Sequence, residues 1–430
     1  MLTAPPLPAI DTSMIDPASA LALDRAINRD RIWERHMAMA RLGAIADDGV
    51  DRACLTPLDR EARRLLIGWA EAAGALVSVD EAANLWARRE GLRHDAPVLT
   101  GSHMDSQPMG GRFDGMTGVL LGLEVLTALH ATGIQTGRPV ELVAWTNEEG
   151  GRFAPGCMGS MAWAGARPLS DFVNVEDLAG VRFGDALAEQ LRLESDLARR
   201  PLGHVPHAYV EVHIEQGPVL EAAEVPIGVV TGIQGARWFV VTIEGRSAHA
   251  GTTPMHLRQD AVQDFLRIGT ALTAAMRDKT GLLRFTIGRI TVAPNTSNSV
   301  AGRLSFTIDL RHPDAETLQT RGDQVAQVAF AAAEGAHIRV RETFTAAPRG
   351  FDPAIMAAIG CAADAAGLAH QALPSGAFHD AQFVAQICPS GMIFIPCRGG
   401  VSHHPSEYAS PGSLAAGARV LAGTLLALAA

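Results

Sequence analysis

The stretch APVLTGSHMDSQPMGGRFDGMTGVLLGLEVLTALHATGIQTGRPVELVAWTN, residues 96–147, decides the fold. An apolar run opens it at 96–102, a longer apolar run follows at 118–133, and a third closes it at 138–147. Short apolar runs bounded by turn residues predict strands, whereas the longer run, which ends at Gly133, predicts a helix. Strand, helix and strand with short polar joints predict a βαβ unit in a mostly parallel sheet.

Outward from this unit, the chain continues the α/β pattern on both sides. Helical spacing of apolar residues predicts helices at about 23–43 and 58–73, and the run at 207–218 predicts a further strand that ends in a turn. Toward the C-terminus, helices are predicted near 353–366 and after Ser410. These elements are expected to form one α/β domain on a mostly parallel sheet.

A different pattern interrupts this domain. Its predicted elements are, in order, strand 238–251, helix 256–278, strands 282–294 and 302–314, helix 315–335 and strand 337–344. Strand, helix, two strands, helix and strand is the order of a ferredoxin-like α+β unit. We therefore predict two domains, one made of residues 1–232 with 347–430 and one inserted at 233–346.

Composition narrows the classes of partner and compartment. The chain has 430 residues, enough for two domains, and a formal net charge of −10, which argues against nucleic acid and anionic membranes as partners. The five cysteines are odd in number and form no C-x-x-C motif, so we expect free thiols in a reducing, cytoplasmic compartment. The N-terminal segment lacks the pattern of a signal peptide, and the apolar C-terminal run, which Arg419 interrupts, is expected to be a packed helix and not a membrane span.

Histidine and acidic side chains gather at the ends of the predicted strands and in glycine-rich joints. They stand in the segments TGSHMDS, GGRFDGMTG, TNEEGG, HIEQGP and GVSHHPSE, and are His103, Asp105, Asp114, Glu148, Glu149, His213, His403 and His404. In an α/β fold, binding sites form at the carboxyl ends of parallel strands. Imidazole nitrogen with carboxylate oxygen is the ligand mix of zinc, and also of manganese, cobalt or nickel. The segments together predict a metal site.

The same segments resemble the M20 family of metal-dependent amidohydrolases and peptidases, and so do GRSAHAGTTPM, NSVAGRLSFTIDLRHPD and GAFHDA. Within that family they resemble the hydantoinase/carbamoylase branch, which contains N-carbamoyl-L-amino acid hydrolases, β-ureidopropionases and allantoate amidohydrolases. HIEQGP and SAHAGTTPM are far more specific to this branch than a bare H-x-D pattern. The resemblance runs from Gly101 to Glu407. It implies an α/β catalytic domain that holds two metals, with an inserted α+β dimerisation or lid domain.

The resemblance also implies a role for each metal-binding side chain. Two divalent ions per subunit, Zn²⁺ or alternatively Mn²⁺, Co²⁺ or Ni²⁺, would be held by His103 and His213 at the first site, by Glu149 and His403 at the second, and by Asp114 as a bridge between them. Glu148 would be the general base, so that one glutamate of the pair binds metal while its neighbour takes a proton from water. His404 would lie outside the ligands.

Two neighbours of these residues are interpreted from their chemistry. Asp105 is expected to accept the free N–H of His103 and so to fix the tautomer of that imidazole. Cys157, which is close in sequence to the glutamate pair, could act as a nucleophile, but a buried spectator thiol is the favoured interpretation.

Residues that bind the substrate are implied in the same way. His249, supplied by the partner subunit of a homodimer, would stabilise the oxyanion. Asn298 and Arg311 would hold the substrate carboxylate, for which the guanidinium fork is suited. Gln216 is expected to contact the ureido group, and His379 is a further polar candidate.

The expected function is that of a binuclear-metal amidohydrolase. Its substrate would be an N-carbamoyl L-α- or β-amino acid, a small ureido acid whose carbamoyl C–N bond is cleaved to give the amino acid, carbon dioxide and ammonia. Allantoate amidohydrolase is the near alternative because it would share every metal ligand. An M20 aminoacylase or dipeptidase is a more distant alternative, against which HIEQGP counts. A non-catalytic binding protein is disfavoured because every expected ligand and Glu148 are present.

Overall fold

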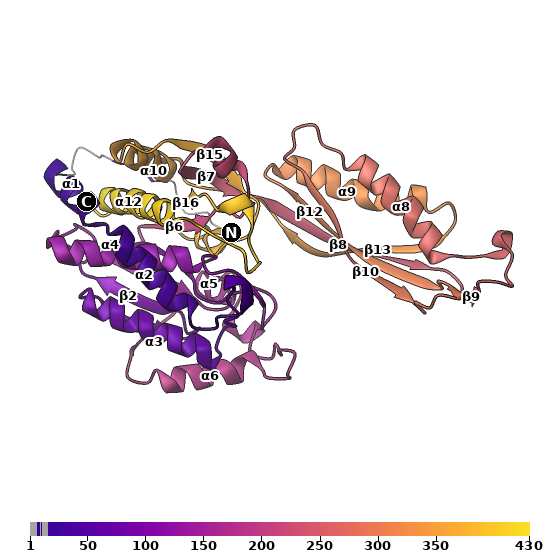
Figure 1. Ribbon diagram of the computed structural model, residues 1–430, viewed down its shortest axis with the longest axis horizontal. Coiled ribbons are helices and arrows are strands. Elements are labelled where there is room, and N and C mark those ends of the chain that lie inside the picture. The colour runs from indigo at the N-terminus through magenta and orange to yellow at the C-terminus, as the bar shows by residue number, and fades with distance from the viewer. Residues whose placement is uncertain (1–6, 9, 11–15) are drawn as a thin grey trace. The chain divides into compact units, whose positions relative to one another are not determined.

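The computed structural model describes residues 7, 8, 10 and 16–430, and the chain forms two compact units (Figure 1). Unit 1 contains the described residues up to Gly232 together with Gly350–Ala430, and unit 2 is Ile233–Arg349. The first unit is an α/β domain and the second is an α+β insertion. These observations confirm the predicted fold class.

Unit 1 is built on one ten-stranded sheet. Its four central strands, β16 (Ser390–Ile395), β6 (Ala208–Ile214), β3 (Val98–His103) and β4 (Val140–Trp145), are parallel. β2 (Leu85–Arg89) joins β4 antiparallel and continues the sheet to β1 (Leu76–Asp80) and β5 (Ala198–Arg200). β7 (Ile227–Ile233) joins β16 antiparallel and pairs with β14 (Arg349–Gly350) and β15 (His370–Ser375). The carboxyl ends of the four parallel strands therefore meet at one edge of the sheet.

The βαβ unit predicted from 96–147 is confirmed as β3, α4 (Met116–Thr132) and β4. α4 is mostly apolar because it packs on β3, β4 and β6 and is covered by α12, α2 and α1; its buried Glu124 is paired with Arg31 of α2 at 2.6 Å. Gly133 ends the helix with a φ of 67°, a left-handed conformation that glycine adopts without strain. Burial on all sides fixes α4, and with it the turn that leads from β3 into the helix.

Two helices replace the single helical stretch predicted at 23–43. α1 (Pro17–Ala26) ends before Ile27, and α2 (Arg29–Ala40) begins after Asn28, whose side chain accepts a hydrogen bond from Arg31 N at 2.9 Å. An asparagine N-cap satisfies a free N–H of the first turn, so a new helix can start there. The remaining helices of unit 1 are α3 (Pro57–Ala72), α5 (Met158–Trp163), α6 (Phe183–Leu193), α7 (Val219–Ala223), α10 (Pro353–Ala365), α11 (Ala381–Val384) and α12 (Pro411–Leu428).

Among the described residues, α12 is the one helix long and apolar enough to cross a membrane. It is 61% buried, it packs on α10, α4, α2 and β16, and its Arg419 forms an ion pair with Asp24 at 2.6 Å. Burial of this kind is typical of the core helix of a folded unit, which is the packed helix that the sequence predicts.

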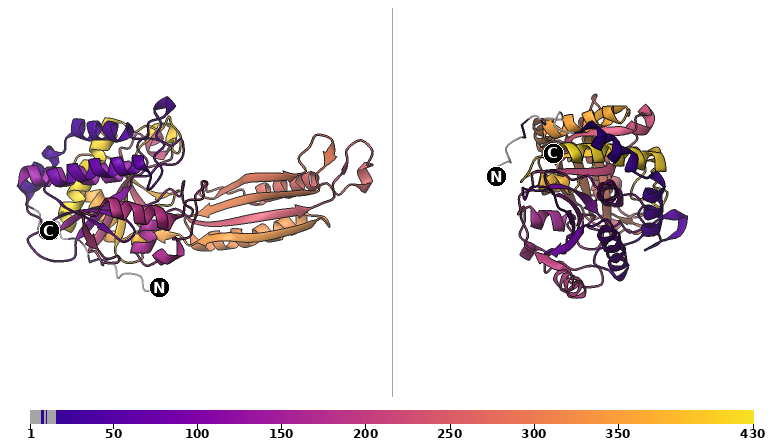
Figure 2. Two further views of the ribbon diagram at one scale, coloured as in Figure 1. Left: turned by 90° about the horizontal axis from the view of Figure 1, so that it is seen from below. Right: turned by 90° about the vertical axis from the view of Figure 1, so that its left-hand side faces the viewer.

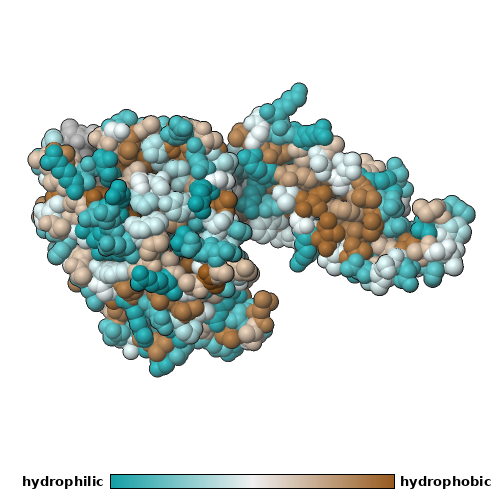
Figure 3. Space-filling view, viewed as in Figure 1, coloured by the Kyte–Doolittle hydropathy of each residue, from teal (hydrophilic) through white to brown (hydrophobic). Residues whose placement is uncertain are grey.

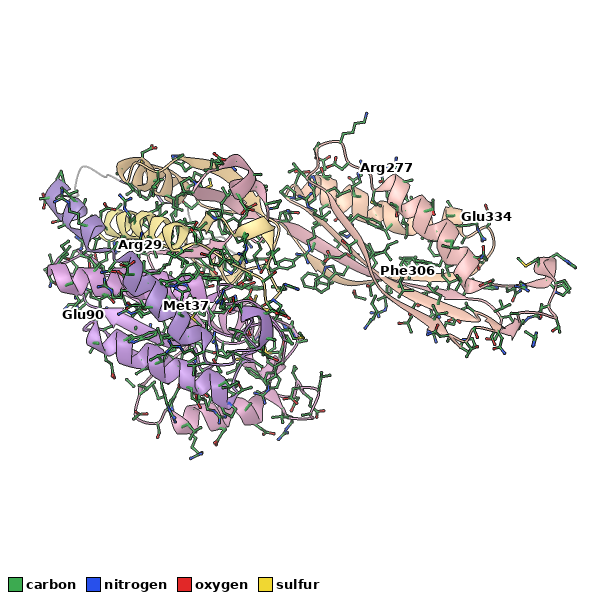
Figure 4. The ribbon with its side chains drawn as sticks, in the orientation of Figure 1. Arg29, Met37, Glu90, Arg277, Phe306 and Glu334 are labelled. Carbon is green, nitrogen blue, oxygen red and sulfur yellow. The ribbon has the colours of Figure 1, made fainter. Side chains whose placement is uncertain are left out.

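Unit 2 has the predicted order of strand, helix, two strands, helix and strand. Its antiparallel sheet runs β10 (Arg284–Ala293), β12 (Arg303–His312), β8 (Gly235–Glu244) and β13 (His337–Ala346), and these long strands lie side by side (Figure 2). α8 (Ala261–Ala275) and α9 (Ala315–Ala332) pack on one face, where buried Phe306 of β12 meets Phe265 of α8 with ring centroids 5.0 Å apart (Figure 4). β9 (Ala248–His249) and β11 (Ser299–Val300) form a separate two-stranded ribbon.

Apolar side chains reach the surface of unit 2 (Figure 3). On the sheet face away from the helices, the rings of Trp238 and Phe344 pack at a tilt of 35° with centroids 4.6 Å apart, and each residue is 37% exposed. Leu266, Ile290 and Phe330 are 52%, 46% and 56% exposed. Apolar surface that gathers on a folded unit is typical of a surface that binds another protein.

Candidate metal centre

The candidate metal ligands lie at the carboxyl edge of the parallel strands of unit 1. His103 is the last residue of β3, His213 is the next-to-last residue of β6, and Glu148 follows the end of β4. Asp114 lies in the turn before α4, and His403 lies in the loop between β16 and α12. Residues that are far apart in the chain meet because parallel strands present their carboxyl ends to one edge of a sheet.

Asp114 stands between two groups of possible ligands. Its Oδ1 lies 3.1 Å from His213 Nε2 and 3.6 Å from His103 Nε2, whereas its Oδ2 lies 3.3 Å from His403 Nε2. Glu149 Oε2 is 3.4 Å from the same His403 nitrogen. The two groups, His103–Asp114–His213 and Asp114–Glu149–His403, each place one possible ligand atom per residue within 4.8 Å of the others. Two groups among the described residues that could bind a metal ion therefore share Asp114.

The hydrogen bonds around the imidazoles test whether this arrangement fits a cation. His103 Nδ1 lies 3.0 Å from the Asp105 carbonyl oxygen, and His213 Nδ1 lies 2.9 Å from that of Ile214. A carbonyl oxygen only accepts, so each Nδ1 donates and each Nε2 keeps its lone pair. Those lone pairs face the Asp114 carboxylate, which also only accepts, and a cation between the atoms would satisfy both; His213 Nε2 also accepts from Gly115 N at 3.1 Å. The donor set of imidazole nitrogens and carboxylate oxygens fits a zinc-type divalent ion.

The turn around Asp114 is held by residues that the sequence analysis did not single out. Phe113 N and Asp114 N donate to Glu407 Oε1 at 2.8 and 3.0 Å, and the Ser402 hydroxyl lies 2.7 Å from Asp114 Oδ2 and 2.9 Å from Glu407 Oε2. Burial raises the pKa of Glu407 to about 7. A Cβ on Gly111 would fall 2.2 Å from the Glu407 carboxylate, so the turn fits tightly against it. Glu407 is the last residue of the segment GVSHHPSE, which also contains His403, so the sequence places this glutamate near a candidate ligand.

Asp105 makes different contacts from those expected. Its Oδ1 is 3.7 Å from His103 Nδ1, beyond hydrogen-bonding distance, and the main-chain carbonyl of Asp105 accepts from that nitrogen instead. The carboxylate accepts from Glu148 N at 3.2 Å and Glu149 N at 3.3 Å. The turn after β4 leaves two main-chain N–H groups that need acceptors, and a carboxylate can bind both. The side chain of Asp105 therefore positions the two glutamates, while its main chain orients His103.

The adjacent glutamates face different partners. Glu148 Oε2 lies 3.4 Å from His103 Nε2, whereas Glu149 Oε2 accepts from Gln107 Nε2 at 2.9 Å and faces His403. Burial raises the pKa of Glu148 well above its usual value, and burial together with the Asp114 charge raises the pKa of Glu149 to about 7. The pair thus provides two buried carboxyl groups with separate environments.

Cys157 contacts the first of these glutamates. Its thiol lies 3.5 Å from Glu148 Oε1, within reach of a sulfur hydrogen bond. Burial raises the pKa of the Cys157 thiol well above its usual value, and the charge of Glu148 adds to this effect. A thiol held in the protonated state is a poor nucleophile, so the geometry favours the spectator interpretation.

Two of the residues expected to bind substrate lie in unit 1 beside the ligands. Gln216 Nε2 donates to Asp114 Oδ2 at 2.7 Å, and within the described part of the chain its Oε1 is buried without a hydrogen-bond partner. His379 is 2% exposed, its ring centroid lies 4.5 Å from that of His213, and its Nε2 lies 2.9 Å from Ser375 Oγ. Burial lowers the pKa of His379 well below its usual value, which keeps the ring neutral.

The structure also brings together a third group, which the sequence analysis did not name. Glu211, His213 and His379 place possible ligand atoms within 4.8 Å of one another. Glu211 already accepts hydrogen bonds from Ser102 Oγ at 2.7 Å and Ala381 N at 3.1 Å. Because the group shares His213 with the first one, it extends the same centre and forms no separate site.

The other three residues expected to bind substrate belong to unit 2. His249 is exposed in β9, and its Nδ1 accepts from Gly251 N at 3.0 Å. Asn298 is exposed just before β11, the strand that pairs with β9. Arg311 lies near the carboxyl end of β12 and forms an ion pair with Asp309 at 2.8 Å. His249 and Asn298 are therefore neighbours, whereas Arg311 lies toward the other end of the unit.

Comparison with known proteins places this arrangement in a family. A family model described as peptidase family M20/M25/M40 matches residues 99–427. The chain is 40% identical over 403 residues to the N-carbamoyl-L-amino-acid amidohydrolase of Rhizobium meliloti. The matched region covers 93% of this chain and 96% of that protein. It is 34% identical over 402 residues to the allantoate amidohydrolase of Bacillus subtilis (strain 168), and that match covers 91% of this chain and 95% of that protein.

Among solved structures, the chain resembles an amidase of the hydantoinase/carbamoylase family from Burkholderia multivorans. The TM-score is 0.86 at 42% identity, over 94% of this chain and 98% of that chain. The matched range, 99–427, begins in β3 and ends in α12, so it contains every candidate ligand at the edge of the sheet. The family that the motifs predict is confirmed, and the chain belongs to the peptidase family M20/M25/M40.

Proposed function

We propose that this chain is a metal-dependent amidohydrolase that hydrolyses N-carbamoyl-L-amino acids. One ureido acid and one water would give the amino acid, carbon dioxide and ammonia. Similarity to the Rhizobium meliloti N-carbamoyl-L-amino-acid amidohydrolase, at 40% identity, supports this substrate class. The observation that carries the proposal is the buried carboxylate of Asp114, whose Oδ1 faces His103 and His213 while its Oδ2 faces His403.

The proposed centre binds two divalent ions, with Zn²⁺ first and Mn²⁺, Co²⁺ or Ni²⁺ as alternatives. His103 and His213 would hold one ion, Glu149 and His403 the other, and Asp114 both. Ions bound there would polarise a carbonyl group and lower the pKa of water at the site. Glu407 and Ser402 would keep Asp114 in position through the hydrogen bonds that hold its turn.

Glu148 is the proposed general base. Its carboxylate is buried, lies beside the ligand His103 and has no role as a ligand, so it is available to take a proton from water and deliver it to the leaving nitrogen. Asp105 would support this role, because it holds the main-chain N–H groups of both glutamates. Asp105 would then act by positioning and would not touch the substrate.

The proposed substrate contacts come from both units. Gln216 and His379 would contact the ureido group. Gln216 Oε1, which has no partner among the described residues, can accept a hydrogen bond from the NH₂ of the ureido group. Asn298 and Arg311 would hold the carboxylate, and His249 would stabilise the oxyanion. Gln216 Nε2 already donates to Asp114. The amide could therefore hold the proposed ligand Asp114 through Nε2 and contact the substrate through Oε1 at the same time.

The position of His249 supports a homodimer. β12 separates the ribbon that carries His249 from Arg311, and a strand of this length spans roughly 25–30 Å. One small ureido acid cannot contact residues at both ends, so we propose that Arg311 and His249 reach a given site from different subunits. The exposed apolar residues of unit 2, which include Leu266 and Phe330, would be covered in the dimer.

We also propose that the protein is cytoplasmic. Its five cysteines are free thiols, as expected in a reducing compartment. Cell fractionation with antibody detection would check this location, and recovery of the protein from an oxidising compartment would contradict it.

Allantoate is the alternative substrate, because the Bacillus subtilis allantoate amidohydrolase is 34% identical over most of both chains. Allantoate carries two ureido groups on one carbon and is larger than an N-carbamoyl amino acid. The two activities would use the same metal ligands and differ in the pocket around the substrate.

One experiment tests the function directly. The protein is loaded with Zn²⁺, Mn²⁺ or Co²⁺ and assayed with N-carbamoyl-L-amino acids, their D-enantiomers, allantoate and N-acetyl amino acids. Ammonia release is followed for the ureido substrates, and release of the free amino acid is followed for the N-carbamoyl and N-acetyl compounds. The proposal requires the highest kcat/KM for an N-carbamoyl-L-amino acid and no turnover after chelation. Preference for allantoate would support the alternative, and preference for the acetylated compounds would contradict both.

A further inference from the structure

Arg52 is a buried arginine in the segment between α2 and α3, outside the range that the family model matches. It is 4% exposed. Its guanidinium makes four hydrogen bonds, all to main-chain carbonyls: Nε and Nη2 donate to Met104 O at 3.1 and 2.9 Å, and Nη1 donates to Met39 O at 3.0 Å and Leu42 O at 2.9 Å. One side chain therefore joins the end of α2, the helix that carries the labelled Met37 in Figure 4, to the residue that follows His103.

The main chain around Arg52 lies against the same loop. Arg52 N donates to Ser106 Oγ at 2.9 Å, and Ser106 N donates to Arg52 O at 3.1 Å. Val50 and Gly110 exchange two main-chain hydrogen bonds of 2.9 Å each. Residues 50–52 therefore support the loop that connects the ligand at the end of β3 to the ligand before α4.

The Met104 carbonyl is a sensitive point in that loop, because it belongs to the peptide group between Met104 and Asp105. The main chain of Asp105 accepts from His103 Nδ1, and its carboxylate accepts from the N–H groups of Glu148 and Glu149. A rotation of the Met104–Asp105 peptide would move both sets of contacts. The hydrogen bonds from Arg52 oppose that rotation.

The chemistry at the site suits an arginine. The carbonyls of Met39 and Leu42 lie at the C-terminal end of α2, where the last turn of a helix carries partial negative charge. A planar guanidinium donates in several fixed directions at once, whereas a lysine ammonium is a point charge on a flexible stem. A lysine at this position would keep the charge but could not hold all three carbonyls in the same geometry.

We propose that Arg52 is a positioning residue that sets the affinity of the His103–Asp114–His213 group for a divalent cation, by fixing the Met104–Asp105 peptide group. This inference rests on the metal-binding role proposed above for His103. Arg52 acts through the loop and touches neither metal nor substrate.

The test compares two conservative variants of the full chain, Arg52→Lys and Arg89→Lys. Arg89 is the matched control, because its Nη2 also donates to main-chain carbonyls, of Leu129 at 3.3 Å and Ile134 at 3.0 Å. It lies opposite Val140, the first residue of β4, and so at the end of that strand away from the candidate site.

Metal-stripped wild type and variants are titrated with Co²⁺, and the Kd, the number of ions bound and the visible absorption of the bound ion are recorded. Arg52→Lys is expected to raise the Kd of one bound ion, the one at the His103–Asp114–His213 group, about 10- to 100-fold and to alter its absorption bands, as loss of outer support for a metal ligand does. Arg89→Lys is expected to leave the Kd within about twofold of wild type. Circular dichroism and thermal unfolding of the metal-free proteins report whether the fold is intact.

Other results would overturn the inference. An Arg52→Lys Kd and absorption spectrum equal to those of wild type, with a lowered unfolding temperature alone, would show that Arg52 only stabilises the fold, and would leave the proposed metal centre intact. Equal losses of affinity in both variants would show a general effect of destabilisation. Wild-type protein that binds no Co²⁺ would overturn both this inference and the proposed function. A second variant, Arg52→Met, removes every side-chain donor at this position and is expected to weaken Co²⁺ binding at least as much. If Arg52→Met does not fold, Arg52→Lys still decides the question.

Discussion

Glu148 and Glu149 are neighbours in the chain, yet their carboxylates face different histidines. Glu148 lies beside His103, and Glu149 lies beside His403. Both residues lie in the bend that follows β4, and the hydrogen bonds from their N–H groups to Asp105 hold this bend in place. Two adjacent glutamates can therefore carry two roles, one as base and one as ligand.

Exchange of Glu148 for glutamine tests this division. Glu148→Gln removes a proton acceptor but no proposed ligand, so kcat is expected to fall about 10²- to 10⁴-fold while metal content is unchanged. Ammonia release and metal analysis of the same samples measure both quantities. Glu149→Gln is the matched control and is expected to lose metal from the second site. Near-normal turnover of metal-loaded Glu148→Gln would contradict the assignment of the base.

Arg311 allows a second test at the level of single residues. Arg311→Ala is expected to raise KM for N-carbamoyl amino acids about 10- to 100-fold, because a hydrogen-bonded charge contributes about 1.5–3 kcal/mol. The corresponding N-carbamoyl amino-acid amides, which keep the ureido group but lack the carboxylate, should be affected little. Arg303→Ala, a change in the same strand at an arginine paired with Glu244 at 3.4 Å, is the control. Equal losses with acid and amide substrates would argue against a carboxylate contact.

At the scale of elements, α2 packs directly behind the turn that carries Asp114. His36 of α2 is fully buried, its Nδ1 donates to Ile32 O at 2.9 Å, and its ring stacks on Phe113 with centroids 5.7 Å apart. Phe113 precedes Asp114, and its N–H is held by Glu407. Packing of α2 and the hydrogen bonds of the turn therefore support the same candidate ligand, Asp114, from two sides.

Burial of His36 predicts a dependence of stability on pH. Burial lowers the pKa of His36 from 6.5 to about 4. Between these values the unfolded state binds more protons than the folded state, so the free energy of unfolding falls as the pH is lowered through this window. The expected loss from His36 is about 2 kcal/mol at about pH 5 relative to about pH 7.5.

His36→Gln measures this contribution, because glutamine does not titrate. Urea unfolding of metal-free wild type and variant at both pH values gives the two differences in free energy of unfolding. The variant is expected to lose less stability on acidification than the wild type does. Parallel losses in the two proteins would show that other groups, and not His36, cause the acid sensitivity.

At the scale of the whole molecule, the chain forms two units of different architecture, and the proposed substrate residues are divided between them. The proposed metal ligands all belong to unit 1, whereas His249, Asn298 and Arg311 belong to unit 2. If His249 acts on the site of a partner subunit, the proposed homodimer is part of the proposed catalytic machinery.

Mixed dimers test whether His249 acts across subunits. His249→Ala and Glu148→Gln subunits are each expected to be nearly inactive as homodimers. A mixed dimer would contain one site with both residues intact, so an equal mixture should recover about a quarter of wild-type activity after subunit exchange. Native mass spectrometry confirms that mixed dimers form. No recovery in confirmed mixed dimers would place His249 within its own subunit's site.

Local pattern was enough to predict several parts of this molecule. The apolar runs at 96–147 predict β3, α4 and β4, because burial on both faces of a parallel strand and around α4 requires continuous apolar sequence. The histidines and acids after the strands predict one centre, because parallel strands place their carboxyl ends together. The motifs predict the family, which the comparisons confirm.

The sequence by itself thus determined the fold class, the family and the types of side chain at the candidate centre, since these follow from apolar periodicity and from residue types in order. Only the tertiary structure decided which carboxylate faces which N–H group. The contacts between Arg52 and Met104 O, and between Glu407 and Phe113 N, join residues 52 and 294 positions apart. Local sequence sets the conformation of the nearby main chain, but a hydrogen bond between distant segments exists only when folding brings them within about 3 Å.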